Sequence, residues 1–129
     1  MKIIKQKYEI NSSLDKVWQA LTNQNEINAW GAGPAVMTDK EGSEFKLWGG
    51  SIWGKNIEVI KNKKLVQDWF SENEIEEEPS KVTFNLKENG SIIEIELIQE
   101  NVPDNVYSKI NDGWKDYYLG AIKNYLENK

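Results

Sequence analysis

The sequence predicts an α+β fold in which a curved antiparallel sheet wraps around a long C-terminal helix. Two observations carry this prediction. Between residues 35 and 101, apolar and polar side chains alternate with a period of two, which is typical of strands. After Pro103, apolar residues recur every three or four positions, as on one face of a helix. A sheet with one wet face and an apolar helix can bury each other, so we expect one domain over residues 1–129.

The N-terminal segment predicts one strand followed by two short helices. Residues 4–10 alternate and are expected to form the strand. Ser12, with Asp15 three residues later, predicts the N-cap of the first helix. Asn23 suits the same role for the second helix, which the Gly- and Pro-containing segment 31–34 ends.

Six further strands complete the predicted sheet. They are expected near residues 35–39, 43–48, 52–61, 64–71, 81–88 and 91–100. The connections between them are short and rich in turn residues, which suits hairpins and a meander. The acidic run from Glu72 to Glu78 is interpreted as a solvated hairpin loop.

The final helix is expected to begin near Pro103 and Asp104, because proline and an acidic residue suit a first helical turn. Its apolar face is predicted to consist of Val106, Tyr107, Ile110, Trp114, Tyr117 or Tyr118, Ala121, Ile122 and Tyr125.

The composition excludes many kinds of chemistry. The 129 residues contain no cysteine and no histidine, and all 16 basic residues are lysines. Thiol nucleophiles, disulfides, His–Cys zinc sites, Ser–His–Asp triads and arginine clamps are therefore impossible. We expect no catalytic residue, cofactor or metal. The net charge of −5 argues against nucleic acid and membrane as partners, and no run approaches the ~20 apolar residues of a membrane span. A soluble, cytoplasmic protein is the expectation.

Two local motifs are better explained by structure than by function. The stretch GGSIWGKN, from Gly49 to Asn56, has the glycine and lysine spacing of a phosphate-binding loop. That loop must lead into a helix, whereas a strand-like segment follows here, and the hydroxyl residue is replaced by asparagine. Glu94 and Glu96 resemble a glycosidase carboxylate pair, but their spacing fits one exposed strand face.

Tryptophan is unusually frequent, with six residues in the chain. Five of these, Trp30, Trp48, Trp53, Trp69 and Trp114, are candidates either for core packing or for lining a pocket. The two interpretations are compatible, since ligand pockets are themselves lined mainly by apolar and aromatic groups.

Four segments carry a resemblance to a known family: SSLDKVWQALTNQNEINAW, EFKLWGGSIWGKNIEVIKNKKLVQDW, VTFNLKENGSIIEIELIQENVP and GWKDYYLGAIKNYL. Their most specific parts are VW..LT.......W at Val17 to Trp30, the turn glycines at Gly49, Gly50 and Gly54, and GW..YY...IK.YL at Gly113 to Leu126. In this order and spacing, the chain resembles the C-terminal domain of the activator of the 90-kDa heat-shock protein ATPase, a member of the START-like (SRPBCC, helix-grip) superfamily. This resemblance implies a helix-grip fold. It also implies that full-length activators carry an additional N-terminal domain, with no counterpart expected in these 129 residues.

The resemblance and the residues leave three hypotheses for function. The first is a co-chaperone-type module that binds a 90-kDa heat-shock chaperone through the Glu72–Glu78 segment or the exposed face of the last helix. The second is a binding protein for a small apolar ligand held between sheet and helix. Its candidate side chains are Trp48, Trp69, Phe84, Trp114 and Tyr118. The third is an enzyme such as a cyclase or hydrolase, built on Asp68 or Asp116. Neither aspartate has a visible partner, so we expect no enzyme.

Overall fold

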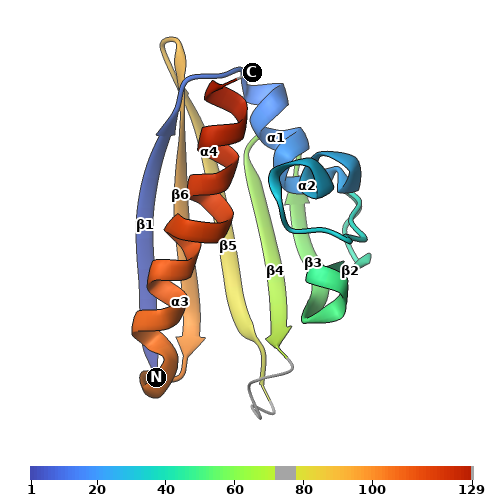
Figure 1. Cartoon of the computed structure of the whole chain (residues 1–129), viewed down its shortest axis with the longest axis vertical. Coiled ribbons are helices and arrows are strands. Elements are labelled where there is room, and N and C mark those ends of the chain that lie inside the picture. The colour runs from blue at the N-terminus through green and yellow to red at the C-terminus, as the bar shows by residue number, and fades with distance from the viewer. Residues whose placement is uncertain (72–77, 129) are drawn as a thin grey trace.

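The computed structural model describes residues 1–71 and 78–128, and in this part of the chain six antiparallel strands form one curved sheet (Figure 1). The strands are β1 (Lys2–Ile10), β2 (Glu44–Leu47), β3 (Ile52–Ile60), β4 (Lys64–Ser71), β5 (Ser80–Asn89) and β6 (Ile92–Val102). Their order across the sheet is β1-β6-β5-β4-β3-β2, so the N-terminal strand pairs with the last strand and forms one edge.

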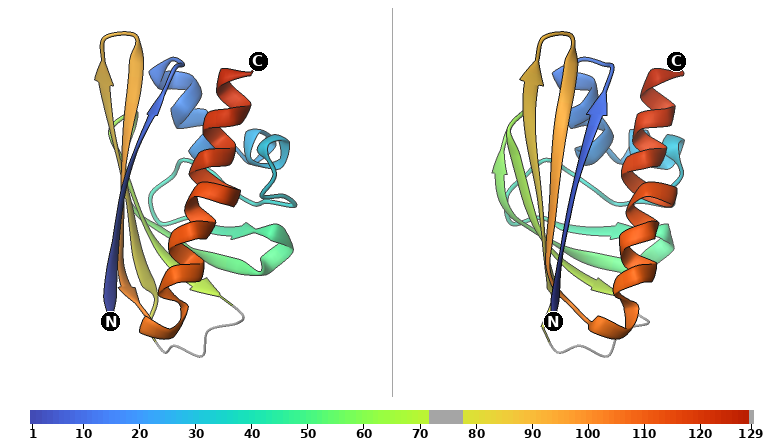
Figure 2. Two further views of the ribbon diagram at one scale, coloured as in Figure 1. Left: turned by 60° about the vertical axis from the view of Figure 1, so that its left-hand side comes forward. Right: turned by 90° about the vertical axis from the view of Figure 1, so that its left-hand side faces the viewer.

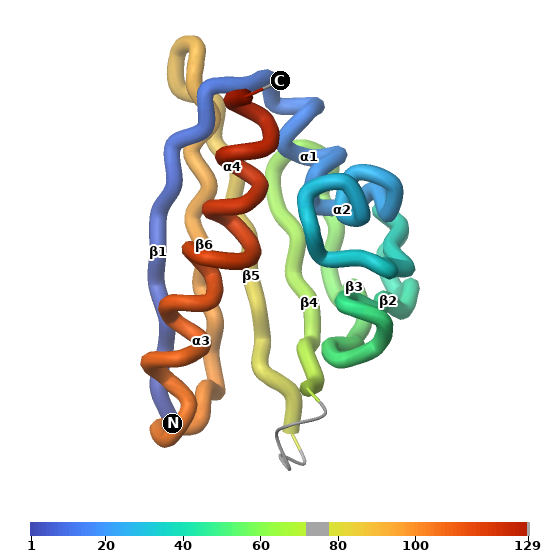
Figure 3. The backbone as a smooth tube through the Cα atoms, viewed as in Figure 1, coloured from blue at the N-terminus to red at the C-terminus, as the bar shows by residue number. Residues whose placement is uncertain are grey.

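Helices cover the inner face of this sheet. They are α1 (Leu14–Thr22), α2 (Gln24–Trp30), α3 (Tyr107–Gly113) and α4 (Leu119–Glu127), with 3-10 turns at Trp48–Gly50 and Asp104–Val106 and a π-helical turn at Trp114–Tyr118. From α3 to α4 the chain runs as one rod along the inner face, while α1 and α2 lie beside its C-terminal half (Figures 2 and 3). The predicted fold class, a sheet gripping a C-terminal helix, is confirmed.

The period-two alternation predicts the inner face of the sheet correctly. The apolar inward residues of β5 and β6 are all buried: Val82, Phe84, Leu86, Ile93, Ile95 and Leu97. Ile4 and Ile10 on β1 are also buried, whereas Lys81 and Lys87 on the outer face are exposed. Apolar residues from α1 and α2 join the same core, so burial of one sheet face organises the whole fold.

The strand predicted at residues 35–39 is wrong, so five strands rather than six follow the two short helices. Only an isolated bridge between Val36 and Lys46 forms there. The backbone amide of Ala35 donates instead to the Asn28 side chain, at 2.9 Å, and that of Met37 to the Gln24 side chain, at 3.3 Å. Because side chains of the α2 segment take these donors, the segment packs as a loop instead of joining the ladder.

The first helix begins one residue later than predicted. Ser13, not Ser12, is the N-cap, and its side-chain oxygen accepts a hydrogen bond from the amide of Lys16 at 3.2 Å. Asn23 caps α2 as predicted, accepting from the amide of Asn25 at 2.9 Å. Both caps satisfy amides that have no partner within the helix.

The π-helical turn keeps one stripe of the C-terminal helix facing the sheet. The inward residues are spaced by four: Ile110, Trp114, Tyr118, Ile122 and Leu126. In an α-helix, four residues overshoot a full turn by about 40°, so such a stripe would rotate away from the sheet. A π turn accommodates one extra residue and offsets part of this drift. The choice left open in the sequence is thereby resolved: Tyr118 is 2% exposed and Tyr117 is 68% exposed.

Gly120 permits this turn. A Cβ atom at this position would overlap the backbone carbonyl oxygen of Lys115, to which the wider turn brings it close. Gly113, at the other end of the turn, has no such constraint, because a Cβ atom there would make only an ordinary contact with Tyr117.

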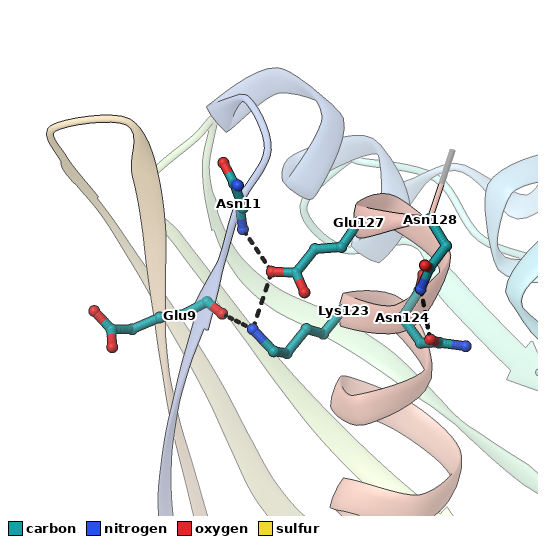
Figure 4. Close-up of polar contacts among 6 residues, drawn as sticks. All are labelled: Glu9, Asn11, Lys123, Asn124, Glu127 and Asn128. Carbon is teal, nitrogen blue, oxygen red and sulfur yellow. Dashed lines mark hydrogen bonds and ion pairs between the residues drawn. The ribbon is translucent and has the colours of Figure 1, made fainter.

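The end of α4 is fixed to the end of β1 by a small polar cluster (Figure 4). The Glu127 carboxylate accepts hydrogen bonds from the backbone amide of Asn11, at 2.8 Å, and from the ammonium group of Lys123, at 3.0 Å. The Lys123 ammonium group also donates to the backbone carbonyl of Glu9. The bond from Asn11, followed by that from Lys123, lowers the pKa of the Glu127 carboxyl below its ordinary value.

Candidate ligand pocket

A pocket of about 410 Å³ lies between the inner face of the sheet and the first half of the C-terminal helical run. Its walls come from the 3-10 turn after β2, from strands β3 to β6, and from α3 with the π turn, all of which can be followed in Figure 1. The large side chains around it are Trp48, Ile52, Trp69, Val106, Ile110, Trp114, Tyr117 and Tyr118.

Four of the five predicted ligand-site residues line this pocket. Trp48 comes from the 3-10 turn, Trp69 from β4, and Trp114 and Tyr118 from the π turn. The fifth, Phe84, is fully buried and does not line the pocket. Its ring packs against those of Trp114 and Tyr118, with centroids 5.8 and 6.0 Å away, so it supports the wall from behind.

The other two candidate tryptophans have different roles. Trp30 is 7% exposed and packs edge-on against Tyr118, with ring centroids 4.8 Å apart, so it belongs to the core. Trp53 is 40% exposed and stacks on Phe70 at 5.9 Å. Gly54, the next residue in β3, is buried, so Trp53 points to the outer face, away from the pocket.

Hydrogen bonds fix all three pocket tryptophans. The indole N–H of Trp48 donates to the carbonyl of Gly31 at 3.1 Å. Those of Trp69 and Trp114 donate to the side-chain oxygens of Gln67 and Gln99, at 2.8 and 2.7 Å respectively. Because each indole donor is already used, these residues offer a ligand their ring faces rather than a hydrogen bond.

Gln67 and Gln99 are the important site residues that were not predicted. Both are buried, with exposures of 0% and 4%. Each occupies an inward position of its strand, Gln67 between Leu65 and Trp69 and Gln99 after Leu97. The signal that could have found them is a polar residue in an otherwise apolar inward series, since a buried amide requires hydrogen-bond partners.

The Tyr118 hydroxyl is buried and has no hydrogen-bond partner among the residues that the structure describes. Burial raises the pKa of this phenol well above its ordinary value, so the hydroxyl stays neutral at physiological pH. A neutral hydroxyl can both donate and accept, yet here it does neither.

The two decoy motifs have structural explanations. The glycine-rich turn leads from Trp48–Gly50 directly into strand β3, so no helix N-terminus is available to bind phosphate. Glu94 forms a 3.2 Å salt bridge with Lys7, and the Glu96 carboxylate accepts a 3.1 Å hydrogen bond from Asn85. Both glutamates therefore belong to the outer strand face, as the alternation indicates.

The aspartates of the enzyme hypothesis do not lie in the pocket. Asp68 is half-buried on the outer face of β4, opposite Lys55 and Lys81 in the strand register. Asp116 is exposed and borders a separate, polar cleft with Tyr8. Over residues 1–71 and 78–128, no group of three acidic residues gathers in a way that could hold a metal ion, and no helix has the length and apolarity to cross a membrane.

Comparison with known proteins identifies the family. Residues 11–127 match the family model for Activator of Hsp90 ATPase homolog 1-like protein. The chain belongs to this family. It is 30% identical over 123 residues to the Activator of 90 kDa heat shock protein ATPase homolog of Dictyostelium discoideum, a match that covers 95% of this chain and 32% of that protein. Over 117 residues it is 23% identical to the Activator of 90 kDa heat shock protein ATPase homolog 2 of Mus musculus, a match that covers 91% of this chain and 35% of that protein. The chain spans about a third of the length of these curated relatives.

Solved structures share the fold of this activator-family chain. The crystal structure of an HSP90 activator from Plasmodium falciparum has a TM-score of 0.90 at 23% identity, covering 98% of this chain and 97% of that one. The Aha1 dimer from Colwellia psychrerythraea has a TM-score of 0.85 at 21% identity, covering 98% and 97%. The helix-grip fold implied by the sequence resemblance is thereby confirmed.

Proposed function

We propose that this protein binds a 90-kDa heat-shock chaperone and changes the rate of its ATPase. The observation that supports this proposal is the family match over residues 11–127, together with the relative from Dictyostelium discoideum that bears the activator name. Because the chain spans only about a third of that relative, the activity of the whole relative is proposed here and not transferred directly.

The exposed face of the last helix is our candidate docking surface. Tyr117 is the large exposed side chain on this face and directly follows Lys115 and Asp116, which are also exposed. Aromatic side chains surrounded by charged groups are frequent at the energetic centre of protein interfaces. The other candidate, the Glu72–Glu78 segment, lies outside the described residues except for Glu78.

The test is the ATPase rate of the source organism's own 90-kDa chaperone, titrated with this protein. We expect a saturable change in rate, and we expect Tyr117→Ala to weaken the apparent affinity roughly ten-fold or more, as loss of an interface aromatic often does. Glu88→Ala, at an exposed position on β5, serves as the control. A flat titration up to tens of micromolar would contradict the proposal.

We infer a second function, the binding of a small apolar ligand, from the pocket itself. Its volume of about 410 Å³ lies within the ~300–1,000 Å³ of typical small-molecule sites. Its aromatic walls are held in fixed orientations by hydrogen bonds, which reduces the ordering that binding requires. Native mass spectrometry of protein purified without denaturation is expected to reveal a bound small molecule. Protein that is entirely ligand-free and binds no apolar compound would contradict this function.

A further inference from the structure

The two buried glutamines beside the pocket differ in one respect. Both accept a hydrogen bond from a pocket tryptophan through the side-chain oxygen. The Gln67 amide nitrogen then donates to the Asn56 side-chain oxygen at 2.9 Å, so this amide uses both ends. The Gln99 amide nitrogen donates to no atom of the residues that the structure describes.

The orientation of the Gln99 amide follows from chemistry. An indole N–H is a donor only, so the atom of Gln99 that lies 2.7 Å from the Trp114 nitrogen must be the oxygen. The amide nitrogen is therefore directed away from Trp114. Gln99 is only 4% exposed, and it lines the pocket. Because Gln99 lines the pocket and this nitrogen is not fully enclosed, we infer that its two unused N–H bonds are accessible from the pocket.

The Gln99 amide nitrogen is not among the fully enclosed polar atoms without a partner in the described residues, so it keeps accessible surface at the pocket. A ligand that places an acceptor there gains a hydrogen bond that an apolar group of the same shape cannot supply. The neighbouring indole donors are all occupied, and the Ser80 hydroxyl donates to the Asn101 carbonyl at 3.2 Å. The Tyr118 hydroxyl also has no partner among the described residues, but its oxygen is fully enclosed and does not open onto the pocket. Gln99 is thus the group best placed to recognise a polar atom deep among the rings.

We propose that the Gln99 amide nitrogen anchors the carbonyl oxygen of a flat, otherwise apolar ligand whose body lies against the pocket tryptophans. This proposal rests on the second proposed function, since it requires the pocket to bind a small molecule. It assigns the chemistry of that molecule: an aromatic or polycyclic ketone, or another neutral compound with a carbonyl oxygen at its inner end. A pure hydrocarbon of the same shape leaves the donor unpaired and binds more weakly.

The test uses a matched pair of probes, 2-acetylnaphthalene and 2-isopropenylnaphthalene, which have nearly the same shape but differ in that a CH2 group replaces the carbonyl oxygen. Calorimetric titration of the full chain is expected to show the ketone binding roughly five-fold more tightly than the hydrocarbon, the effect of one net hydrogen bond. Gln99→Glu retains an oxygen for the Trp114 indole but replaces the donor, so the preference should fall below about two-fold. Gln24→Glu makes the same change at an exposed position on α2 and should keep the preference.

A second measurement needs no substitution. In the unaltered protein, the side-chain amide resonances of Gln99 should shift when the ketone is added and stay in place with the hydrocarbon. If Gln99→Glu does not fold, this spectrum and the variant Gln99→Met serve as the test, because methionine has no N–H donor and should also lose the preference for the ketone. Equal affinity for both probes, with no amide shift, would overturn the anchor and leave the pocket as an apolar site. If neither probe binds, the second proposed function fails, and the anchor fails with it.

Discussion

Replacing Trp114 by alanine is the most direct test of how the last helix packs. The side chain is 4% exposed, and its ring lies 4.9 to 5.8 Å from the rings of Trp69, Phe84 and Tyr118. A buried tryptophan removes ~200 Å² from water, which at about 25 cal/mol per Å² gives ~5 kcal/mol, less the part that alanine retains. The substitution also frees the Gln99 oxygen, although water in the adjacent pocket can reach it. We therefore expect a loss of about 4 kcal/mol in the free energy of unfolding.

Urea denaturation followed by far-ultraviolet circular dichroism measures this loss through the transition midpoint at constant slope. Tyr117→Ala is the matched control, because that residue lies three positions away and is 68% exposed. We expect it to change stability by less than about 0.5 kcal/mol. A loss below about 1 kcal/mol for Trp114→Ala would refute the reasoning, since it would mean that the ring contributes little to the core.

Three further predictions concern the C-terminal helical run. Gly120→Ala should lower the free energy of unfolding by about 1–3 kcal/mol, because the new methyl group overlaps the Lys115 carbonyl. Gly113→Ala should be neutral or stabilising, because its methyl group meets only an ordinary contact. Thermal unfolding should therefore show a lower midpoint for the first variant and no loss for the second. Tyr118→Phe should raise the stability of the ligand-free protein by roughly 1 kcal/mol in urea, because it removes a buried hydroxyl without a partner; a loss would reveal a hydrogen bond to water. The lowered pKa of Glu127 means that its carboxylate stabilises the fold above its ordinary pKa of 4.5, and that this contribution disappears as the pH falls through the lowered value. The stability advantage over Glu127→Gln, measured from pH 7 to pH 3, should therefore vanish in acid, and a constant difference would contradict it.

Much of the sheet could be predicted from sequence because burial of one face imposes a strict period of two. Ile93, Ile95 and Leu97 follow this rule, and all three are buried. The prediction of a strand at residues 35–39 was wrong because this segment also alternates in polarity. Its amides donate to side chains of the α2 segment, and no local sequence pattern reveals those bonds. The π turn was hidden for a related reason: an apolar spacing of four fits an α-helix almost as well as it fits a helix with one wide turn.

The candidate site was predictable in its rings but not in its polar atoms. Large aromatic residues on inward positions must face the space between sheet and helix, so Trp69 and Trp114 could be placed. Phe84 could not be separated from them, since the same inward register serves both the pocket wall and the layer behind it. The role of Gln99 depends on a contact between β6 and the helix, and such long-range pairs have no signature in a single sequence. The assignment of residues 1–129 to one domain stays a prediction, as do the ligand and the chaperone partner.

The place of β1 at the sheet edge constrains the order in which the chain can fold. Lys2 pairs with Val102 and Ile10 with Ile93, so this edge cannot form until nearly the whole sequence is available. The hairpins from β2 to β6 are local and can form earlier, but the part of their apolar face that the last helix covers stays exposed until that helix docks. During synthesis, the incomplete sheet therefore exposes this part of its apolar face to solvent. Folding is expected to be slow for a chain of this length, and a chain cut after Val102 should aggregate.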